Sequence, residues 1–178
     1  LVPMLQMKVL QQARGTRISM LDSMNLWIEI ARDDLLAVMK SVDLIIINDG
    51  EVRMLAEDDN LIRASRQLIA MVGCQTLIIK KGENGVLAFH GDDMIALPAY
   101  PTENVVDPTG CGDSFAGTIA ACLAANNGPI SKSELRDALI RATVTASFTL
   151  ESFGTSGLIG LTLEKFKLRL AQFEEILS

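Results

Sequence analysis

Residues 105–117 read VVDPTGCGDSFAG and run into an apolar stretch, residues 115–125, that is typical of a helix. The glycines at 110 and 112 let the backbone come close to a charged group. Backbone N–H groups at a helix N-terminus form an anion site, because unpaired donors and the helix dipole both favour negative charge. Asp113, directly after the second glycine, can take a proton from a hydroxyl while the anion site holds a phosphoryl group. The stretch therefore indicates phosphoryl transfer to an alcohol.

The longer stretch VVDPTGCGDSFAGTIAACLA resembles the C-terminal signature of the PfkB (ribokinase-like) carbohydrate kinases, D-T-x-G-A-G-D-x-F. It departs from that signature at Pro108, which stiffens the loop and removes a donor, and at Cys111, which keeps its backbone N–H. The resemblance implies that Asp113 is the general base and that the N–H groups of Gly110, Cys111 and Gly112 hold the transferred phosphoryl group. The alternative is a glycine-rich turn that only caps a buried helix. The flanking aspartates and the segments on either side favour the kinase.

Strand-like and helix-like segments alternate along the chain. The β-branched runs at 44–47 and 76–79 predict strands that are buried on both faces. Strand–helix–strand spacing implies a parallel sheet covered by helices, and the segments 85–89 and 94–97 predict an antiparallel edge hairpin. Further elements are expected at 5–13, 33–39, 61–72, 131–150 and 163–177 as helices and at 17–21 as a strand. The expected fold is α/β, a ribokinase-like three-layer αβα sandwich with a mostly parallel sheet.

Polar residues follow two of the predicted strands, where ligands bind in open α/β sheets. Asn48 and Glu51 resemble the N-x-x-E motif of the family, which implies that they hold Mg²⁺ and water around the nucleotide phosphates. The alternative for Glu51 is a plain first-turn residue of a helix. Lys80 matches a family position that lines the nucleotide and can meet a phosphate as a point charge. Gly82 and Gly85 let the backbone pass close to the same ligand.

Other site residues rest on the resemblance. Asp107 matches an aspartate that helps to hold a monovalent cation, K⁺, behind the anion hole, and a loop-capping role is the alternative. Thr109 lies in the same loop beside the nucleotide. The segment TASFTLESFG falls where the family cups adenine, which nominates Ser147, Ser152 and Gly154.

A second segment has no assigned role. Asp22 and Asn25 follow the first predicted strand and resemble a D-x-N segment near the nucleotide and substrate cleft. The arginine that usually follows this segment in the family is missing here.

Composition limits the classes of partner. The formal net charge of −6 and the pI near 4.8 argue against a nucleic-acid binder, which would carry a basic stripe. The apolar runs are too short to span a bilayer. Cys74, Cys111 and Cys122 show no C-x-x-C spacing, which favours reduced cysteines and a cytoplasmic protein.

Ribokinase-like enzymes are longer than this chain, so residues 1–178 are expected to be the C-terminal part of a kinase domain, without its N-terminal half and lid. The resemblance implies ATP- and Mg²⁺-dependent phosphotransfer to a hydroxyl of a sugar or of a nucleoside. A homodimer is one assembly that the resemblance allows. The alternative is a non-catalytic nucleotide-binding or interaction module, which includes an inactive fragment. A dinucleotide-binding oxidoreductase is disfavoured, because no G-x-G-x-x-G follows the first predicted strand.

Overall fold

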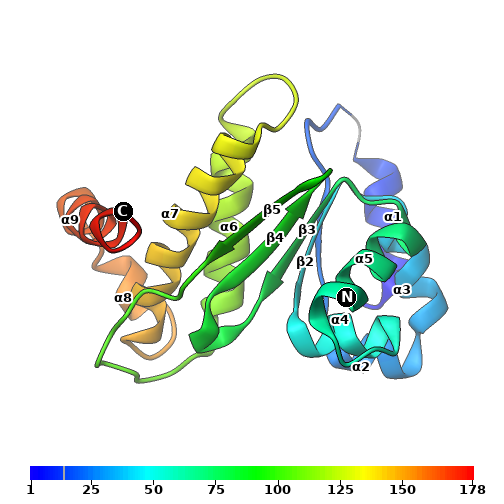
Figure 1. Cartoon of the computed structure of the whole chain (residues 1–178), viewed down its shortest axis with the longest axis horizontal. Coiled ribbons are helices and arrows are strands. Elements are labelled where there is room, and N and C mark those ends of the chain that lie inside the picture. The colour runs from blue at the N-terminus through cyan, green and yellow to red at the C-terminus, as the bar shows by residue number, and fades with distance from the viewer. Residues whose placement is uncertain (14) are drawn as a thin grey trace. The chain divides into compact units, whose positions relative to one another are not determined.

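The computed structural model describes residues 1–13 and 15–178, and its contacts divide the chain into two compact units (Figure 1). Unit 1 comprises Leu1–Lys81 and Leu87–Ile95, and unit 2 comprises Gly82–Val86 and Ala96–Ser178. The chain therefore passes from one unit to the other three times, so neither unit is a continuous piece of sequence.

Five strands form a sheet in the order β1-β2-β3-β4-β5. Their bounds are Met20–Asp22, Leu44–Asn48, Thr76–Lys80, Val86–His90 and Asp93–Leu97. β1, β2 and β3 are parallel, with Leu21, Ile45 and Leu77 in register. Only Gly91 and Asp92 separate β4 from β5, and a connection this short joins antiparallel strands. The predicted parallel sheet with an edge hairpin is confirmed.

The core of unit 1 lies between one face of this sheet and the helices of the unit. These helices are α1 (Pro3–Gln12), α2 (Asn25–Ile30), α3 (Arg32–Met39), α4 (Asp49–Ala56) and α5 (Leu61–Val72). Alternate strand residues, among them Ile45, Ile47 and Ile79, join the core because successive side chains of a strand point to opposite faces. Ile46 and Ile78 point the other way and are also buried, as the continuous apolar runs predict.

Unit 2 is mainly helical. It contains the short 3₁₀ helix η1 (Gly82–Asn84) and helices α6 (Cys111–Ala124), α7 (Lys132–Leu150), α8 (Ser156–Ile159) and α9 (Leu163–Ile176). α6 and α7 lie side by side (Figure 1). α7 begins with a capping box between Ser131 and Glu134, as its sequence predicts, and Phe173 of α9 is fully buried. No helix in the described part of the chain is both long and apolar enough to cross a membrane.

The predicted start of α6 is wrong. The sequence places the first helical residue at Phe115, where the apolar run begins. In the structure α6 begins at Cys111, so that Gly112 and Asp113 lie within its first turn. The difference arises because Gly110 is the N-cap residue with φ 84°, a left-handed conformation that glycine adopts without strain.

Candidate active site

The N-terminus of α6 presents backbone donors beside a carboxylate. Ser114 N–H donates to Gly110 O at 2.9 Å, and Cys111 N–H donates to Pro108 O at 3.1 Å. Gly110 has no side chain to cap the helix, so no side chain of the N-cap residue satisfies the N–H groups of Gly112 and Asp113. The Asp113 side chain is exposed in the same turn. This end of α6 can receive an anion, and an anion that reaches Cys111 must compete with Pro108 O.

The loop before α6 is fixed to the end of α7, within unit 2. The N–H groups of Val106 and Asp107 donate to Leu150 O at 3.0 and 3.2 Å. Thr149 Oγ1 donates to Ser114 Oγ at 2.9 Å. These contacts fix the glycine loop, and with it the loop's backbone donors, against a long helix.

Two residues of this loop have other contacts. Cys111 Sγ lies 3.6 Å from Ala146 O, and burial raises the pKa of its thiol. Asp107 Oδ1 accepts the Thr109 N–H at 2.9 Å, and this hydrogen bond lowers the pKa of Asp107. The loop-capping role of Asp107 is therefore present in the structure, and its role toward K⁺ stays a prediction.

Asn48 and Glu51 lie in unit 1, where β2 ends and α4 begins. They form a capping box, in which Glu51 N–H donates to Asn48 Oδ1 and Asn48 N–H donates to Glu51 Oε2, both at 2.8 Å. Glu51 is 1% exposed, and its second oxygen, Oε1, is buried without a hydrogen-bond partner among the described residues. Buried acceptors without a partner are rare in proteins, and an oxygen in this situation is suited to bind a water molecule or a cation.

The pKa of Glu51 is raised, primarily by burial. The Asn48 N–H and the charge of Lys80 oppose this rise, and the charge of Asp22 adds to it. Burial therefore disfavours the charged form of Glu51, a situation that is common at functional sites.

Replacing the carboxyl of Glu51 by an amide should stabilise the fold at neutral pH. Between the ordinary pKa of 4.5 and the raised folded-state value, the unfolded chain releases its proton while the folded chain keeps it. The stability of the wild type should therefore fall as pH rises through this window. Glu51→Gln keeps an acceptor for Asn48 N–H, so we expect it to gain about 0.5–2 kcal/mol at pH 7. This gain should shrink as pH falls toward 4.5 and be lost below it.

Urea unfolding at a series of pH values measures this difference. Glu134→Gln is the matched control, because Glu134 has the same place in the capping box of α7 and is only partly buried. A wild type that gains stability as pH rises from 4.5 to 7, relative to Glu51→Gln, would contradict the expectation.

Lys80 is engaged by another side chain. Its ammonium donates to both carboxylate oxygens of Asp22, at 2.8 and 3.0 Å, at the carboxyl ends of β3 and β1. The sequence did not assign a role to Asp22, although its place directly at the end of a parallel strand is a signal for a site residue. Lys80 could be predicted as a site residue from its own position at the end of a parallel strand. The ion pair between Asp22 and Lys80 could not be predicted from the sequence.

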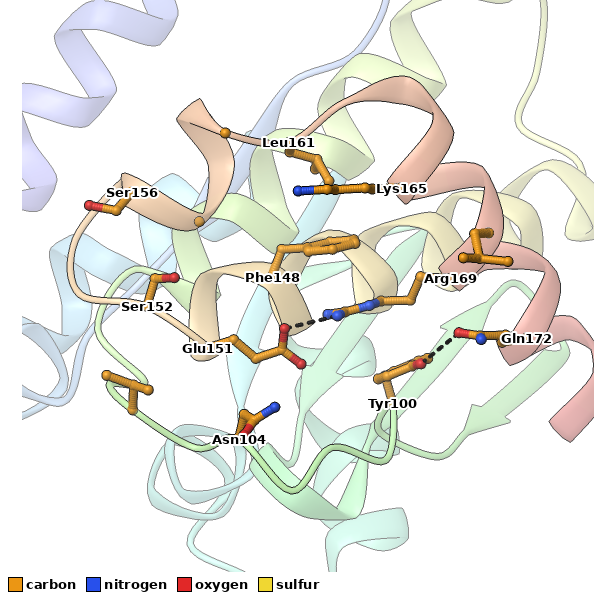
Figure 2. Close-up of a pocket in the computed structure, with 14 residues that line it drawn as sticks. Tyr100, Asn104, Phe148, Glu151, Ser152, Ser156, Leu161, Lys165, Arg169 and Gln172 are labelled. Atoms are coloured by element: carbon orange, nitrogen blue, oxygen red, sulfur yellow. Dashed lines mark hydrogen bonds and ion pairs between the residues drawn. The ribbon is translucent and has the colours of Figure 1, made fainter.

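A pocket of about 620 Å³ lies in unit 2 between the end of α7, the loop before α6, α8 and α9 (Figure 2). Ser152 lies on its wall, as do Phe148 and Glu151. Ser147 is buried, donates to Val144 O and accepts a hydrogen bond from Arg169 Nη1 at 3.0 Å. Of the three residues nominated for adenine, the structure therefore places Ser152 at a cavity and Ser147 in the interior, and Gly154 lies in the turn that follows α7.

Arg169 organises this pocket. Its guanidinium lies 3.7 Å from the ring centre of Phe148 and 5.1 Å from that of Tyr100, and it pairs with Glu151 at 2.8 Å. Figure 2 shows the Arg169 guanidinium close to Phe148, Tyr100 and Glu151, with Lys165 on the preceding turn of the same helix. Arg169 was not predicted from the sequence, because an arginine on an amphipathic helix is usually a solvated surface residue.

The family model for pfkB family carbohydrate kinases matches residues 4–159. The chain belongs to the pfkB family of carbohydrate kinases. Cytidine kinase from Thermococcus kodakarensis is 36% identical over 121 residues, which are 65% of this chain and 42% of that enzyme. Fructokinase-2 from Oryza sativa subsp. japonica is 31% identical over 112 residues, or 62% of this chain and 33% of that enzyme. This pfkB-family chain thus spans less than half the length of these two curated relatives.

Solved structures confirm the ribokinase-like fold of this pfkB-family chain. Aminoimidazole riboside kinase from Salmonella enterica, complexed with aminoimidazole riboside and an ATP analog, matches with a TM-score of 0.77 at 23% identity, over 90% of this chain and 56% of that one. The nucleoside kinase of Methanocaldococcus jannaschii matches with a TM-score of 0.74 at 23% identity, over 96% of this chain and 53% of that one. At identities this low, the similarity to these structures shows a shared fold and nothing about the substrate.

Proposed function

We propose that the full-length protein transfers the γ-phosphoryl group of ATP to a hydroxyl group of a sugar or a nucleoside. The observation that carries this proposal is the start of α6, where a glycine cap leaves backbone donors without a side-chain acceptor and an exposed Asp113 lies in the same turn. An anion site next to a carboxylate supplies both requirements of phosphoryl transfer to an alcohol, charge neutralisation and a proton acceptor.

Asp113 acts on the acceptor. The acceptor hydroxyl oxygen attacks the γ-phosphorus, the bond from that phosphorus to the bridging oxygen breaks, and ADP leaves with the electron pair. The hydroxyl proton passes to the Asp113 carboxylate. The exposure of this side chain supports the role, because a substrate can reach it.

The glycine loop neutralises the charge of the transferred group. The N–H groups of Gly110 and Gly112 would donate to the γ-phosphoryl group from the positive end of the α6 dipole. The N–H of Cys111 would join them by exchanging its hydrogen bond to Pro108 O for one to the phosphoryl group. Because the transition state is loose, fixed donors contribute more than proton removal. The hydrogen bonds from this loop to α7 support this role, since donors that are already in place need little reorganisation.

Asn48 and Glu51 would hold Mg²⁺, mainly through its water ligands. The unpartnered buried Oε1 of Glu51 and the side-chain oxygen of Asn48 fit a hard cation that prefers oxygen ligands and keeps its waters. When bound, Mg²⁺ neutralises charge on the nucleotide phosphates. Asp107 has a lowered pKa and stays ionised, which supports a role in holding K⁺.

The remaining residues contact the nucleotide. Lys80, Gly82, Gly85 and Thr109 line its phosphates. The pocket beside α7 takes the adenosine end, with Ser152 on its wall and Ser147 and Gly154 behind it; its volume of about 620 Å³ is in the usual range for such ligands. One relative is named cytidine kinase and another fructokinase, so the relatives support a nucleoside acceptor and a sugar acceptor equally. Three free cysteines support a reducing, cytoplasmic setting.

Calorimetric titration of Mg·ADP into the full-length protein tests this proposal. Wild type should bind, and Gly112→Asp should bind about 10- to 100-fold more weakly, because it places a negative charge where the phosphate lies. Gly117→Asp is the control, since position 117 is exposed on the same helix and a Cβ there meets no atom within 4 Å. Equal affinity of wild type and Gly112→Asp would refute the anion site. A wild type that binds no Mg·ADP would favour a module without kinase activity.

A further inference from the structure

We propose that Asp22 is a positioning residue of this site, which holds the Lys80 ammonium in place for the nucleotide phosphates and away from Glu51. The inference rests on the proposed function and adds a residue whose role neither the motif nor the fold assigns. It comes from the contacts at the carboxyl ends of β1, β2 and β3, all within unit 1.

The strand register puts the three side chains on one face of the sheet. Asp22 pairs with Ile46, and Asn48 pairs with Lys80. Because side chains alternate along a strand, Asp22, Asn48 and Lys80 point to the same side. Neighbouring strands are about 4.8 Å apart, so the ion pair between β1 and β3 reaches across the end of β2, where Asn48 caps α4.

The carboxylate of Asp22 is itself fixed. Its Oδ1 accepts the N–H of Ser23 at 2.9 Å, and both of its oxygens accept from Lys80. The side chains of Lys80 and Asp22 are 23% and 32% exposed, so the pair is better shielded than an ordinary surface salt bridge. An ammonium group has three donors, and two are used by Asp22. No other acceptor contacts the ammonium group among the described residues, so its third donor can meet an anionic oxygen.

Glu51 is the competing partner for Lys80. The two side chains interact electrostatically, and Glu51 Oε1 has no hydrogen-bond partner among the described residues. Without the charge of Asp22, the Lys80 ammonium should move toward this buried oxygen. It would then leave the phosphate and occupy the oxygen proposed to hold a water of Mg²⁺. Asp22 therefore keeps two opposite charges of the site apart.

A double-mutant cycle on the full-length enzyme tests the role of Asp22. We expect Asp22→Asn to raise the KM for Mg·ATP and the Mg²⁺ concentration for half-maximal rate about tenfold each, with a smaller change in kcat. Asp22→Glu, which keeps the charge, should recover most of this loss. Lys80→Met should cost about 10- to 100-fold in kcat/KM, and the double variant should be no worse, because Asp22 acts through Lys80.

Asp58→Asn is the matched control, because it removes another ion pair of unit 1, with Arg63, away from the strand ends. It should leave the KM for Mg·ATP unchanged. An active wild type with an unchanged KM in Asp22→Asn, or a double variant whose loss equals the product of the single losses, would overturn the inference and leave the proposed function standing. A wild type without phosphotransfer toward any sugar or nucleoside would overturn the proposed function, and the inference with it.

Discussion

Asp113→Asn should lower kcat about 10²- to 10⁴-fold, the usual loss for a general acid–base residue, with little change in the KM for Mg·ATP. An amide cannot accept the hydroxyl proton, whereas the backbone donors at the start of α6 and the cap at Gly110 stay in place. The variant should therefore still bind the nucleotide but transfer its phosphoryl group slowly. Steady-state kinetics with the preferred acceptor, together with Mg·ADP titration, measure the two effects separately.

The control for this variant is Asp33→Asn. Asp33 is also an exposed acidic residue in the first turn of a helix, α3, so its removal costs the same favourable interaction with a helix dipole, about 0.3–1 kcal/mol of stability. Its kcat should match that of the wild type. A loss below tenfold in Asp113→Asn would show that Asp113 is not the base, whatever the affinity for the nucleotide.

Gly85→Ala should destabilise the protein by about 2–5 kcal/mol, from about 1–2 kcal/mol of left-handed backbone strain and about 1–3 kcal/mol of overpacking. Gly85 has φ 83°, and a Cβ at this position would lie 2.1 Å from Leu97 O and 2.6 Å from the carbonyl carbon of Pro98. These are backbone atoms, so no side-chain rotation relieves the contact. The end of β5 would have to move away from the loop that follows η1.

Gly82→Ala separates the two contributions. Gly82 also has a positive φ, 56°, but a Cβ there meets no atom within 4 Å, so only the backbone strain applies and the loss should be about 1–2 kcal/mol. Urea unfolding of both variants gives the difference. Equal losses would mean that the loop moves aside at no cost. Since both glycines are also proposed to line the nucleotide, Mg·ADP affinity should be compared only under conditions where each variant is folded.

Much of the fold could be predicted from the sequence, because burial follows local periodicity. The apolar runs of β2 and β3 and the amphipathic α5 are found within a residue of their predicted bounds. The short α2 and α8 were not predicted, since a helix of one or two turns has too little periodicity to recognise. The start of α6 was misplaced because the apolar run begins only at Phe115, whereas the left-handed cap at Gly110 starts the helix at Cys111.

The site could be predicted where its residues are adjacent in sequence. The glycine loop and the pair of Asn48 and Glu51 are short motifs. In the structure the first caps the N-terminus of α6 and the second forms the capping box of α4. The ion pair of Asp22 and Lys80 joins two strands that are not neighbours in the sheet. No local pattern specifies which charge a lysine meets across a sheet. The same holds for Arg169, which depends on the packing of α9 against α7.

The three crossings of the chain between its two units limit how the protein can be cut or rearranged. Residues 82–86 belong to unit 2 but are inserted between parts of unit 1, and residues 87–95 return to unit 1 before the glycine loop begins. Each unit is built from segments on both sides of residues 82–95. A protease cut or a new terminus in this stretch would therefore divide the segments of both units between two pieces of chain. Split-protein pairs and circular permutants of this pfkB-family chain should therefore be opened elsewhere. A break in the connection between α6 and α7 would interrupt neither the interleaved segments nor the glycine loop.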